Sequence, residues 1–224
     1  MLIYYIFELV YLFNAIGTSI LIYITRSKRH TEGISFYSQL MFTIAATVQI
    51  YYFIHSPMSR YMFFWAITLV HVALNLYFLF LMRTYKRISL NPEKNTFDYR
   101  ILLILAAVLA YLSMYEKNHS LQLYLLAIRF CNFTEALGLL PQIKLMRVEK
   151  FVPVYIGYYL LSLLVSRAFR IWFWVQLKSW NRRYGDDSET YIIVILADVV
   201  YVCLIADFVY NWFKHKGNRL IPVS

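Results

Sequence analysis

Seven long apolar stretches, separated by short polar connections, constrain the fold of this chain more than any other feature. They lie at about residues 2–24, 34–54, 60–82, 99–115, 120–143, 153–176 and 190–213. A helix needs roughly 20 apolar residues to cross the hydrocarbon core of a bilayer. A helix also satisfies its own backbone polar groups there, where no water is present. The sequence therefore predicts an all-α polytopic membrane protein, with seven transmembrane helices in one domain that covers residues 1–224.

The composition supports a membrane protein and argues against a soluble enzyme. Hydrophobic residues make up 61% of the chain and charged residues 15%, whereas soluble domains carry about 25% charged residues. The sequence shows no metal-ligand spacing, no glycine-rich phosphate loop and no nucleophile beside a base. Cys131 and Cys203 both lie within apolar stretches and imply no disulfide framework. We therefore expect no enzymatic activity, no metal ion and no cofactor.

Basic residues between the apolar stretches predict how the chain crosses the membrane. Thirteen Lys and Arg residues lie in alternate connections and in the C-terminal tail, and five lie in the connections on the other side. Cytosolic loops carry the excess of Lys and Arg. The N-terminus is therefore expected in the lumen or outside the cell, and the short basic tail, residues 214–224, in the cytosol. The net charge of +10 then reflects topology, so we expect membrane lipid rather than nucleic acid as a partner.

Charged residues inside the apolar stretches are the candidate functional residues, because a charge at membrane depth costs roughly 2.5–3.5 kcal/mol on insertion scales. Those that demand partners are Arg129, Glu135, Arg167, Arg170 and Asp198. The helical rise predicts that the three arginines and Glu135 could meet in one half of a bundle. The five residues carry one surplus positive charge, which favours an anionic ligand held by guanidinium groups. A closed network of ion pairs without a ligand is the alternative. His71, alone on its helix, is expected to be a neutral core histidine, with a pH-sensing role as the alternative.

A series of short motifs runs from the first connection to the last helix. The motifs are Thr25-Arg26-Ser27, Gly33-Ile34-Ser35, Ser38-Gln39-Leu40, Asn95-Thr96-Phe97, Glu135 with Leu140-Pro141-Gln142, Arg167-Ala168, and Asp207-Phe208 with Tyr210. Together they resemble the endoplasmic-reticulum retention receptors, which capture escaped lumenal proteins that bear a C-terminal Lys-Asp-Glu-Leu-type signal. Leu-Pro-Gln alone also occurs in other Pro-Gln-loop transporters, including sugar transporters of the SWEET type.

The resemblance implies two three-helix bundles joined by a linker helix, and a lumen-facing polar cavity that binds the C-terminal peptide of lumenal proteins. It implies loading in the acidic Golgi, return to the endoplasmic reticulum with the retrograde COPI coat, and release at neutral pH. The protein would then lie in the membranes of both compartments. Glu135, Arg167 and Asp207 match family positions. The trafficking residues implied are Asp207, Lys214, Lys216 and Arg219.

Several ligand-binding positions of the family differ in this chain. A family arginine of the first helix aligns with Phe7, the pH-sensing histidine with Asn14, and an arginine of the second helix with Gln49. Arg129 and Arg170 match no family position and are candidate replacements for the missing arginines, as His71 is for the missing sensor. The candidate ligand-binding residues are therefore Arg167, Glu135, Arg170, Arg129, Asn14 and Gln49.

Three functions remain open on the sequence alone. The first is a retention-signal receptor with an altered ligand preference, and the second is a small-solute transporter of the Pro-Gln-loop type. The third is a divergent protein of the secretory pathway that binds no such peptide. A transporter is expected to have a Pro or Gly break in its first bundle. Residues 1–56 contain no Pro, and Gly17 alone lies within an early stretch, which favours the receptor.

Overall fold

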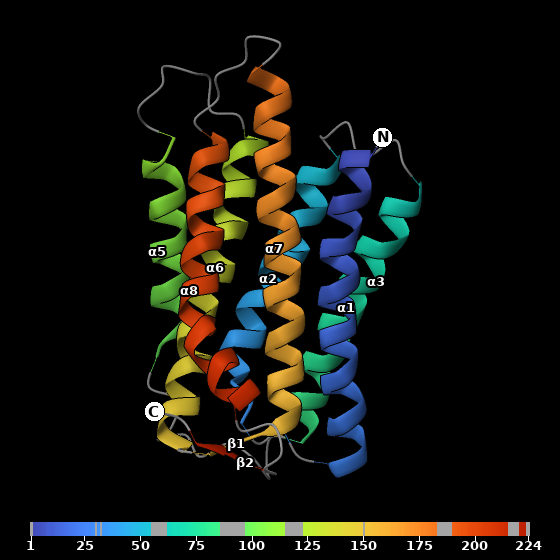
Figure 1. Cartoon of the computed structure of the whole chain (residues 1–224), viewed down its shortest axis with the longest axis vertical. Coiled ribbons are helices and arrows are strands. Elements are labelled where there is room, and N and C mark those ends of the chain that lie inside the picture. The colour runs from blue at the N-terminus through green and yellow to red at the C-terminus, as the bar shows by residue number, and fades with distance from the viewer. Residues whose placement is uncertain are drawn as a thin grey trace.

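The computed structural model of the chain describes residues 2–29, 31, 33–54, 62–85, 97–114, 123–149, 151–182, 190–214 and 220–222. These residues form seven helices and two short strands. In chain order the elements are α1 (Leu2–Lys28), α2 (Phe36–Ile54), α3 (Met62–Thr84), α5 (Tyr99–Leu112), α6 (Leu123–Glu149), β1 (Phe151–Pro153), α7 (Val154–Arg182), α8 (Thr190–Lys214) and β2 (Leu220–Pro222). All seven helices follow the long axis of the molecule (Figure 1).

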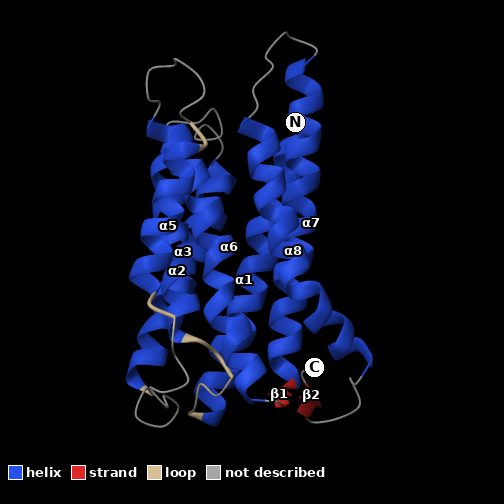
Figure 2. Cartoon of the chain, turned by 90° about the vertical axis from the view of Figure 1, so that its left-hand side faces the viewer, coloured by secondary structure: helices blue, strands red, loops and turns tan. Residues whose placement is uncertain are grey.

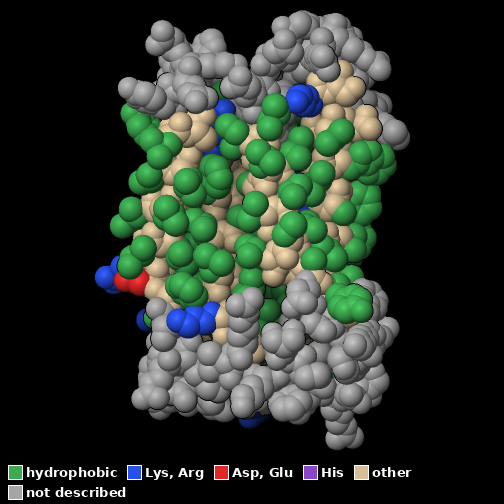
Figure 3. Space-filling model, turned by 60° about the vertical axis from the view of Figure 1, so that its left-hand side comes forward, with side chains coloured by type: hydrophobic (Ala, Val, Ile, Leu, Met, Phe, Trp, Pro, Cys, Tyr) green, Lys and Arg blue, Asp and Glu red, His purple; other side chains and the backbone are tan. Residues whose placement is uncertain are grey.

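Each predicted apolar stretch corresponds to one helix, so the prediction of a polytopic helical membrane protein is confirmed. Within the described residues, Tyr5–Lys28, Met62–Thr84 and Val154–Ser179 are long and apolar enough to cross a membrane by themselves, and Tyr99–Leu112 and Ile192–Ala206 are shorter apolar helices. Hydrophobic side chains form a band around the middle of the bundle on the face drawn in Figure 3. Such a band is the surface that lipid requires.

The helices form two triplets with the same internal order. In the first triplet α3 packs against both α1 and α2, and in the second α8 packs against both α6 and α7. The triplets meet where α1 contacts α7 and where α2 contacts α6, while α5 lies outside and packs on α6 (Figures 1 and 2). This is the arrangement of two bundles and a linker helix that the resemblance implied.

A glycine lies at each contact between the triplets. A Cβ atom on Gly17 of α1 would overlap the hydroxyl oxygen of Ser162 on α7. A Cβ atom on Gly138 of α6 would lie 3.2 Å from the Cβ of Met41 on α2. The absence of a side chain at these two positions therefore allows the paired helices to approach closely.

The Pro-Gln motif fixes the connection between α1 and α2. The Gln142 side-chain amide donates to the Gly33 carbonyl at 2.7 Å, and its oxygen accepts from the Ser35 amide at 2.8 Å. Gly33 has a φ of 76°, a left-handed conformation that glycine adopts without steric cost. At the same end of the molecule β1 pairs antiparallel with β2, with Val152 opposite Ile221, which adds a short sheet to the predicted all-helical fold.

Two apolar cores fill the interior. We call the end where α1 begins the upper end, as drawn in Figure 1. The upper core comprises Ile6, Phe7, Val10, Tyr11, Phe53, Phe64, Ala127, Ile128, Phe173, Trp174 and Val194. The lower core comprises Leu21, Ile34, Phe78, Met82, Ala136, Leu139, Met146, Tyr155, Ile156, Tyr159, Leu160, Leu163, Tyr201, Ile205 and Val209. The candidate site lies between these two cores.

Candidate ligand-binding site

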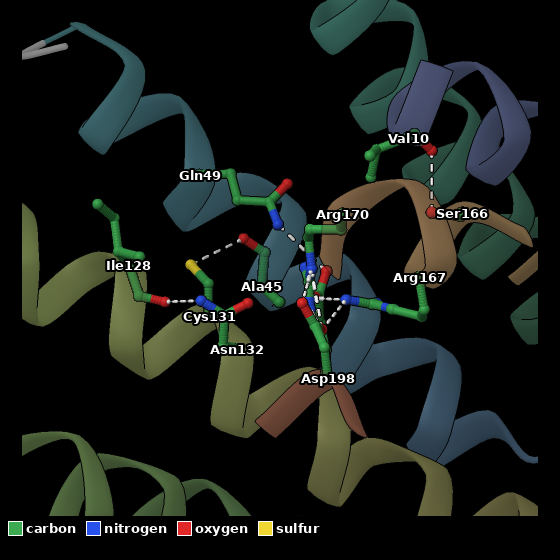
Figure 4. Close-up of polar contacts among 11 residues, drawn as sticks. Val10, Ala45, Gln49, Ile128, Cys131, Asn132, Ser166, Arg167, Arg170 and Asp198 are labelled. Carbon is green, nitrogen blue, oxygen red and sulfur yellow. Dashed lines mark hydrogen bonds and ion pairs between the residues drawn. The ribbon is translucent and has the colours of Figure 1, made fainter. Parts of the chain in front are cut away.

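Two arginines and two carboxylates form the ion cluster at the centre of the bundle, defined as Glu135, Arg167, Arg170 and Asp198. One oxygen of Glu135 on α6 accepts from Arg167 Nη1 at 2.7 Å and from Arg170 Nη1 at 2.5 Å. Arg170 Nε donates to both oxygens of Asp198 on α8, at 2.9 and 2.8 Å, and its Nη2 also contacts Asp198. Figure 4 shows the arginines reaching across from α7. All four residues are buried.

The cluster follows from helix geometry and charge balance. Arg167 and Arg170 are three residues apart, so they project from one face of α7. Glu135 on α6 and Asp198 on α8 supply two negative charges from the other two helices of the same triplet, and the four residues are together neutral. Taking a charge out of water costs several kcal/mol unless a partner with good geometry compensates it. In this conformation the cluster is therefore a closed network of ion pairs, which was the alternative interpretation of the sequence.

Arg129 lies at a different place from the one expected. It donates to the backbone carbonyl and to the hydroxyl of Ser113, the residue that caps the C-terminal end of α5. Orphan carbonyls at a helix C-terminus carry partial negative charge and favour a cation. The expectation that Arg129 adds a surplus positive charge to the cluster is therefore wrong, and the cluster is neutral without it.

An amide side chain of the first triplet contacts the cluster. Gln49 on α2 donates from Nε2 to the second oxygen of Glu135 at 3.1 Å. The side-chain oxygens of Gln49 and of Asn14 on α1 are buried and have no hydrogen-bond partner among the described residues, and the same holds for Arg167 Nε and the Tyr201 hydroxyl. The Tyr201 ring lies 4.1 Å from the Arg167 guanidinium carbon. Gln49 and Arg167 thus leave an unused acceptor and an unused donor at the ion cluster.

His71 belongs to a separate polar chain in the first triplet. The Asn75 side-chain amide lies 3.2 Å from His71 Nδ1 and donates to the His71 carbonyl at 2.8 Å. Gln39 on α2 donates to Asn75 at 2.8 Å. His71 is therefore a buried histidine, as expected, and its ring contacts the side chain of Asn75. The sequence reasoning missed Asn75 and Gln39, and the four-residue spacing of His71 and Asn75 on one helix was the available signal.

Six aromatic rings from four helices lie between the ion cluster and the upper end. We call them the aromatic layer, and they are Phe7, Tyr11, Phe53, Phe64, Phe173 and Trp174. The ring centroids of Phe7 and Phe173 are 4.4 Å apart, and those of Phe53 and Phe64 are 4.6 Å apart. Contacts of this kind stabilise aromatic pairs beyond their buried area. Phe7, which aligns with a family arginine, is thus at the centre of an apolar cluster.

The predicted trafficking residues are not tested by the structure. Asp207 lies in α8 and Lys214 ends that helix, but their side chains are outside the described residues. Lys216 and Arg219 lie outside the described residues altogether. Their role in coat binding stays a prediction.

Comparison with known proteins identifies the family. The chain matches the model of the ER lumen protein retaining receptor over residues 30–177. The ER lumen protein-retaining receptor erd-2.2 of Caenorhabditis elegans is 30% identical over 185 residues, which cover 81% of this chain and 80% of the relative. An ER lumen protein-retaining receptor of Dictyostelium discoideum is 24% identical over 206 residues, which cover 90% of this chain and 91% of the relative. The chain therefore belongs to the ER lumen protein-retaining receptor family.

Membership of this family confirms several predictions from the sequence. The resemblance to the retention receptors is confirmed. The relatives are named as receptors and not as enzymes. The family and the apolar helices together support a multi-pass membrane protein.

Proposed function

We propose that this member of the retention-receptor family binds the C-terminal peptides of lumenal proteins in the Golgi and returns them to the endoplasmic reticulum. The observation that carries the proposal is the buried ion cluster, in which Arg167 and Arg170 lie at membrane depth among unused hydrogen-bonding groups. The distribution of basic residues supports an orientation with the upper end toward the lumen and the C-terminal tail in the cytosol.

Arg167 is the proposed anchor for the ligand's terminal carboxylate. Its Nη1 donates to Glu135, while its Nε is buried without a partner among the described residues. A carboxylate that approached the Nε edge would form the two-bond contact that guanidinium groups favour. Asn14 and Gln49 would accept hydrogen bonds from the ligand's backbone amides through their unpaired oxygens. Arg170, which is held by Asp198, would support the site.

A ligand carboxylate adds a negative charge to a neutral cluster, and the addition is compensated if a proton is taken up with the ligand. Ligand binding is then linked to proton uptake, so affinity should rise as the pH falls. The sign agrees with loading in the acidic Golgi and release at neutral pH. For one proton the change is at most about tenfold per pH unit.

The deciding experiment measures the affinity of purified full-length protein for tetrapeptides with free and amidated C-termini at an acidic and a neutral pH. Free-acid peptides should bind, and bind more tightly at acidic pH, while amidated peptides should not. Arg167→Ala should abolish binding at near-normal expression, because Glu135 keeps its contact with Arg170. Arg167→Lys should also bind poorly, since an ammonium group cannot form the planar two-bond contact, and loss of Arg170 should have a weaker effect. Full affinity in Arg167→Ala would remove this residue from the site.

The basic tail is the proposed contact with the retrograde COPI coat. Lys214, Lys216 and Arg219 follow the last apolar stretch, and Asp207 is proposed to assist in trafficking because it matches a family position. Replacing the three basic residues with serine should move the protein away from its steady-state location, as seen by imaging of a tagged protein in cells. An unchanged location would show that these charges only fix the membrane topology.

A small-solute transporter is the second candidate function. The equivalent glycines at the two contacts between the triplets, Gly17 and Gly138, favour it because they could allow the triplets to move against each other. Uptake of a solute by proteoliposomes, with no binding of free-acid peptides, would support the transporter over the receptor.

A further inference from the structure

Within the described bundle, each buried arginine already has an acceptor. Arg129 donates to Ser113, Arg167 to Glu135 and Arg170 to Asp198. The Nε edge of Arg167 is the contact proposed for the ligand's terminal carboxylate. The other two described buried arginines are held by Ser113 and by Asp198, so neither is placed to compensate acidic side chains of the ligand.

The aromatic layer lies one helical turn above the ion cluster. Phe173 and Trp174 follow Arg170 by three and four residues on α7, and Phe53 follows Gln49 by four residues on α2. One turn of helix rises about 5.4 Å. An extended peptide rises about 3.3 Å per residue. A peptide whose C-terminal carboxylate reached Arg167 from the upper end would therefore have its preceding one or two side chains level with the aromatic layer.

The burial of this region also disfavours acidic side chains. Phe7 and Phe53 are 1% and 0% exposed. A carboxylate placed among these rings would be desolvated without a cation to compensate its charge. An aromatic or large aliphatic side chain would instead gain the free energy of apolar burial and ring contacts.

We propose that the aromatic layer makes this receptor selective for peptides that carry large apolar or aromatic residues, and not acidic ones, directly before the C-terminal residue. The inference rests on the proposed function, since it takes binding of a C-terminal carboxylate at Arg167 as given. Phe7, Phe53, Phe64 and Phe173 are the specificity-determining residues, because their rings would contact the ligand side chains.

The test compares four peptides on the purified full-length protein: Lys-Phe-Phe-Leu, Lys-Asp-Glu-Leu and Lys-Ala-Ala-Leu with free C-termini, and amidated Lys-Phe-Phe-Leu. The Phe-Phe peptide should bind at least roughly tenfold more tightly than the Asp-Glu peptide, which is the factor that burial of one phenyl ring provides. The Ala-Ala peptide should lie between them, and the amidated peptide should not bind.

Two matched variants distinguish ligand selection by the aromatic layer from a general effect on core packing. Phe53 in the aromatic layer and Phe78 in the lower core are both fully buried. Phe53→Leu should reduce the preference for Phe-Phe over Ala-Ala several-fold. Phe78→Leu should leave the preference as it is. An equal effect of both variants would show that the aromatic layer does not select the ligand.

The remaining outcomes distinguish this inference from the proposed function. If the Asp-Glu peptide bound as tightly as the Phe-Phe peptide or more tightly, the selectivity would be refuted while the receptor function stood. If no free-acid peptide bound, the receptor function would be refuted, and the selectivity with it.

Discussion

The two triplets share one packing plan but differ in charge. Gly17 and Gly138 are 121 residues apart and occupy the two contacts between the triplets. The same offset relates Asn14 to Glu135 and Gln49 to Arg170. At the positions equivalent to Glu135 and Arg170 of the second triplet, the first triplet thus has neutral amides.

The third helices show the same contrast. His71 of α3 and Asp198 of α8 lie at similar distances from the starts of their helices, Met62 and Thr190. His71 lies beside the neutral Asn75 amide, whereas Asp198 bonds with arginines of α7. The second triplet therefore holds a complete neutral ion cluster, and the first offers hydrogen-bonding groups that carry no charge.

This division has a physical advantage. A buried ion pair needs its partners at fixed distances, and such partners are most easily held within one rigid packing unit. Neutral amides tolerate movement better, because an unpaired amide costs about 1–3 kcal/mol, less than an unpaired charge. The first triplet is consequently the half that could adjust around a ligand, and the second is the half that would hold the carboxylate of the proposed ligand.

The largest expected effect is a difference in stability between variants that remove equivalent residues from the two triplets. Glu135→Ala leaves Arg167 without its closest carboxylate and Arg170 with only Asp198, so unfolding should become easier by about 3–5 kcal/mol. Asn14→Ala removes only a neutral group and should cost about 1 kcal/mol or less. Thermal unfolding of both variants in detergent measures the difference. Equal destabilisation would mean that the charge contrast between the triplets does not matter for stability.

A smaller effect is expected at the contacts between the triplets. Gly17→Ala forces the Ser162 hydroxyl to move and should destabilise the protein by about 1–3 kcal/mol, as overpacking does. Gly138→Ala places a Cβ 3.2 Å from Met41 and Phe42, a tighter contact than usual but one that small shifts relieve, so it should cost less. The double variant Gly17→Ala/Ser162→Ala should recover most of the loss. No recovery would place the strain in the backbone instead of the hydroxyl.

The fold was largely predictable from the sequence, because each helix is one apolar stretch of about bilayer length. The pairing of Arg167 with Glu135 was also predictable, since both lie at membrane depth and neither can remain uncompensated. The depth of a residue along the bundle axis, however, does not determine toward which neighbouring helix its side chain points. Arg129 has a suitable depth but lies six residues from Glu135, a turn and two-thirds away, and it donates to Ser113, the residue that caps α5.

Two other features could not be found from sequence patterns. The correspondence between the triplets is a relation between positions, such as Gln49 and Arg170, whose residue types differ, so no repeated motif marks it. The aromatic layer combines residues of four helices, and aromatic residues near the ends of apolar stretches are equally typical of membrane interfaces. Only the packing of α1, α2, α3 and α7 distinguishes buried rings from interfacial ones.

The smallest expected effect tests whether a charged group of the second triplet strengthens its hydrogen bond with the first triplet. Gln49 and Gln39 lie on the same helix and are both buried, but Gln49 donates to the Glu135 carboxylate and Gln39 to the neutral Asn75 amide. Gln49→Met should cost about 1.5 kcal/mol of unfolding free energy, because hydrogen bonds to charged groups are the stronger ones. Gln39→Met, the matched control, should cost about 1 kcal/mol. Thermal unfolding in the same detergent compares the two, and a larger loss for Gln39→Met would show that Gln49 contributes little to holding Glu135 in place.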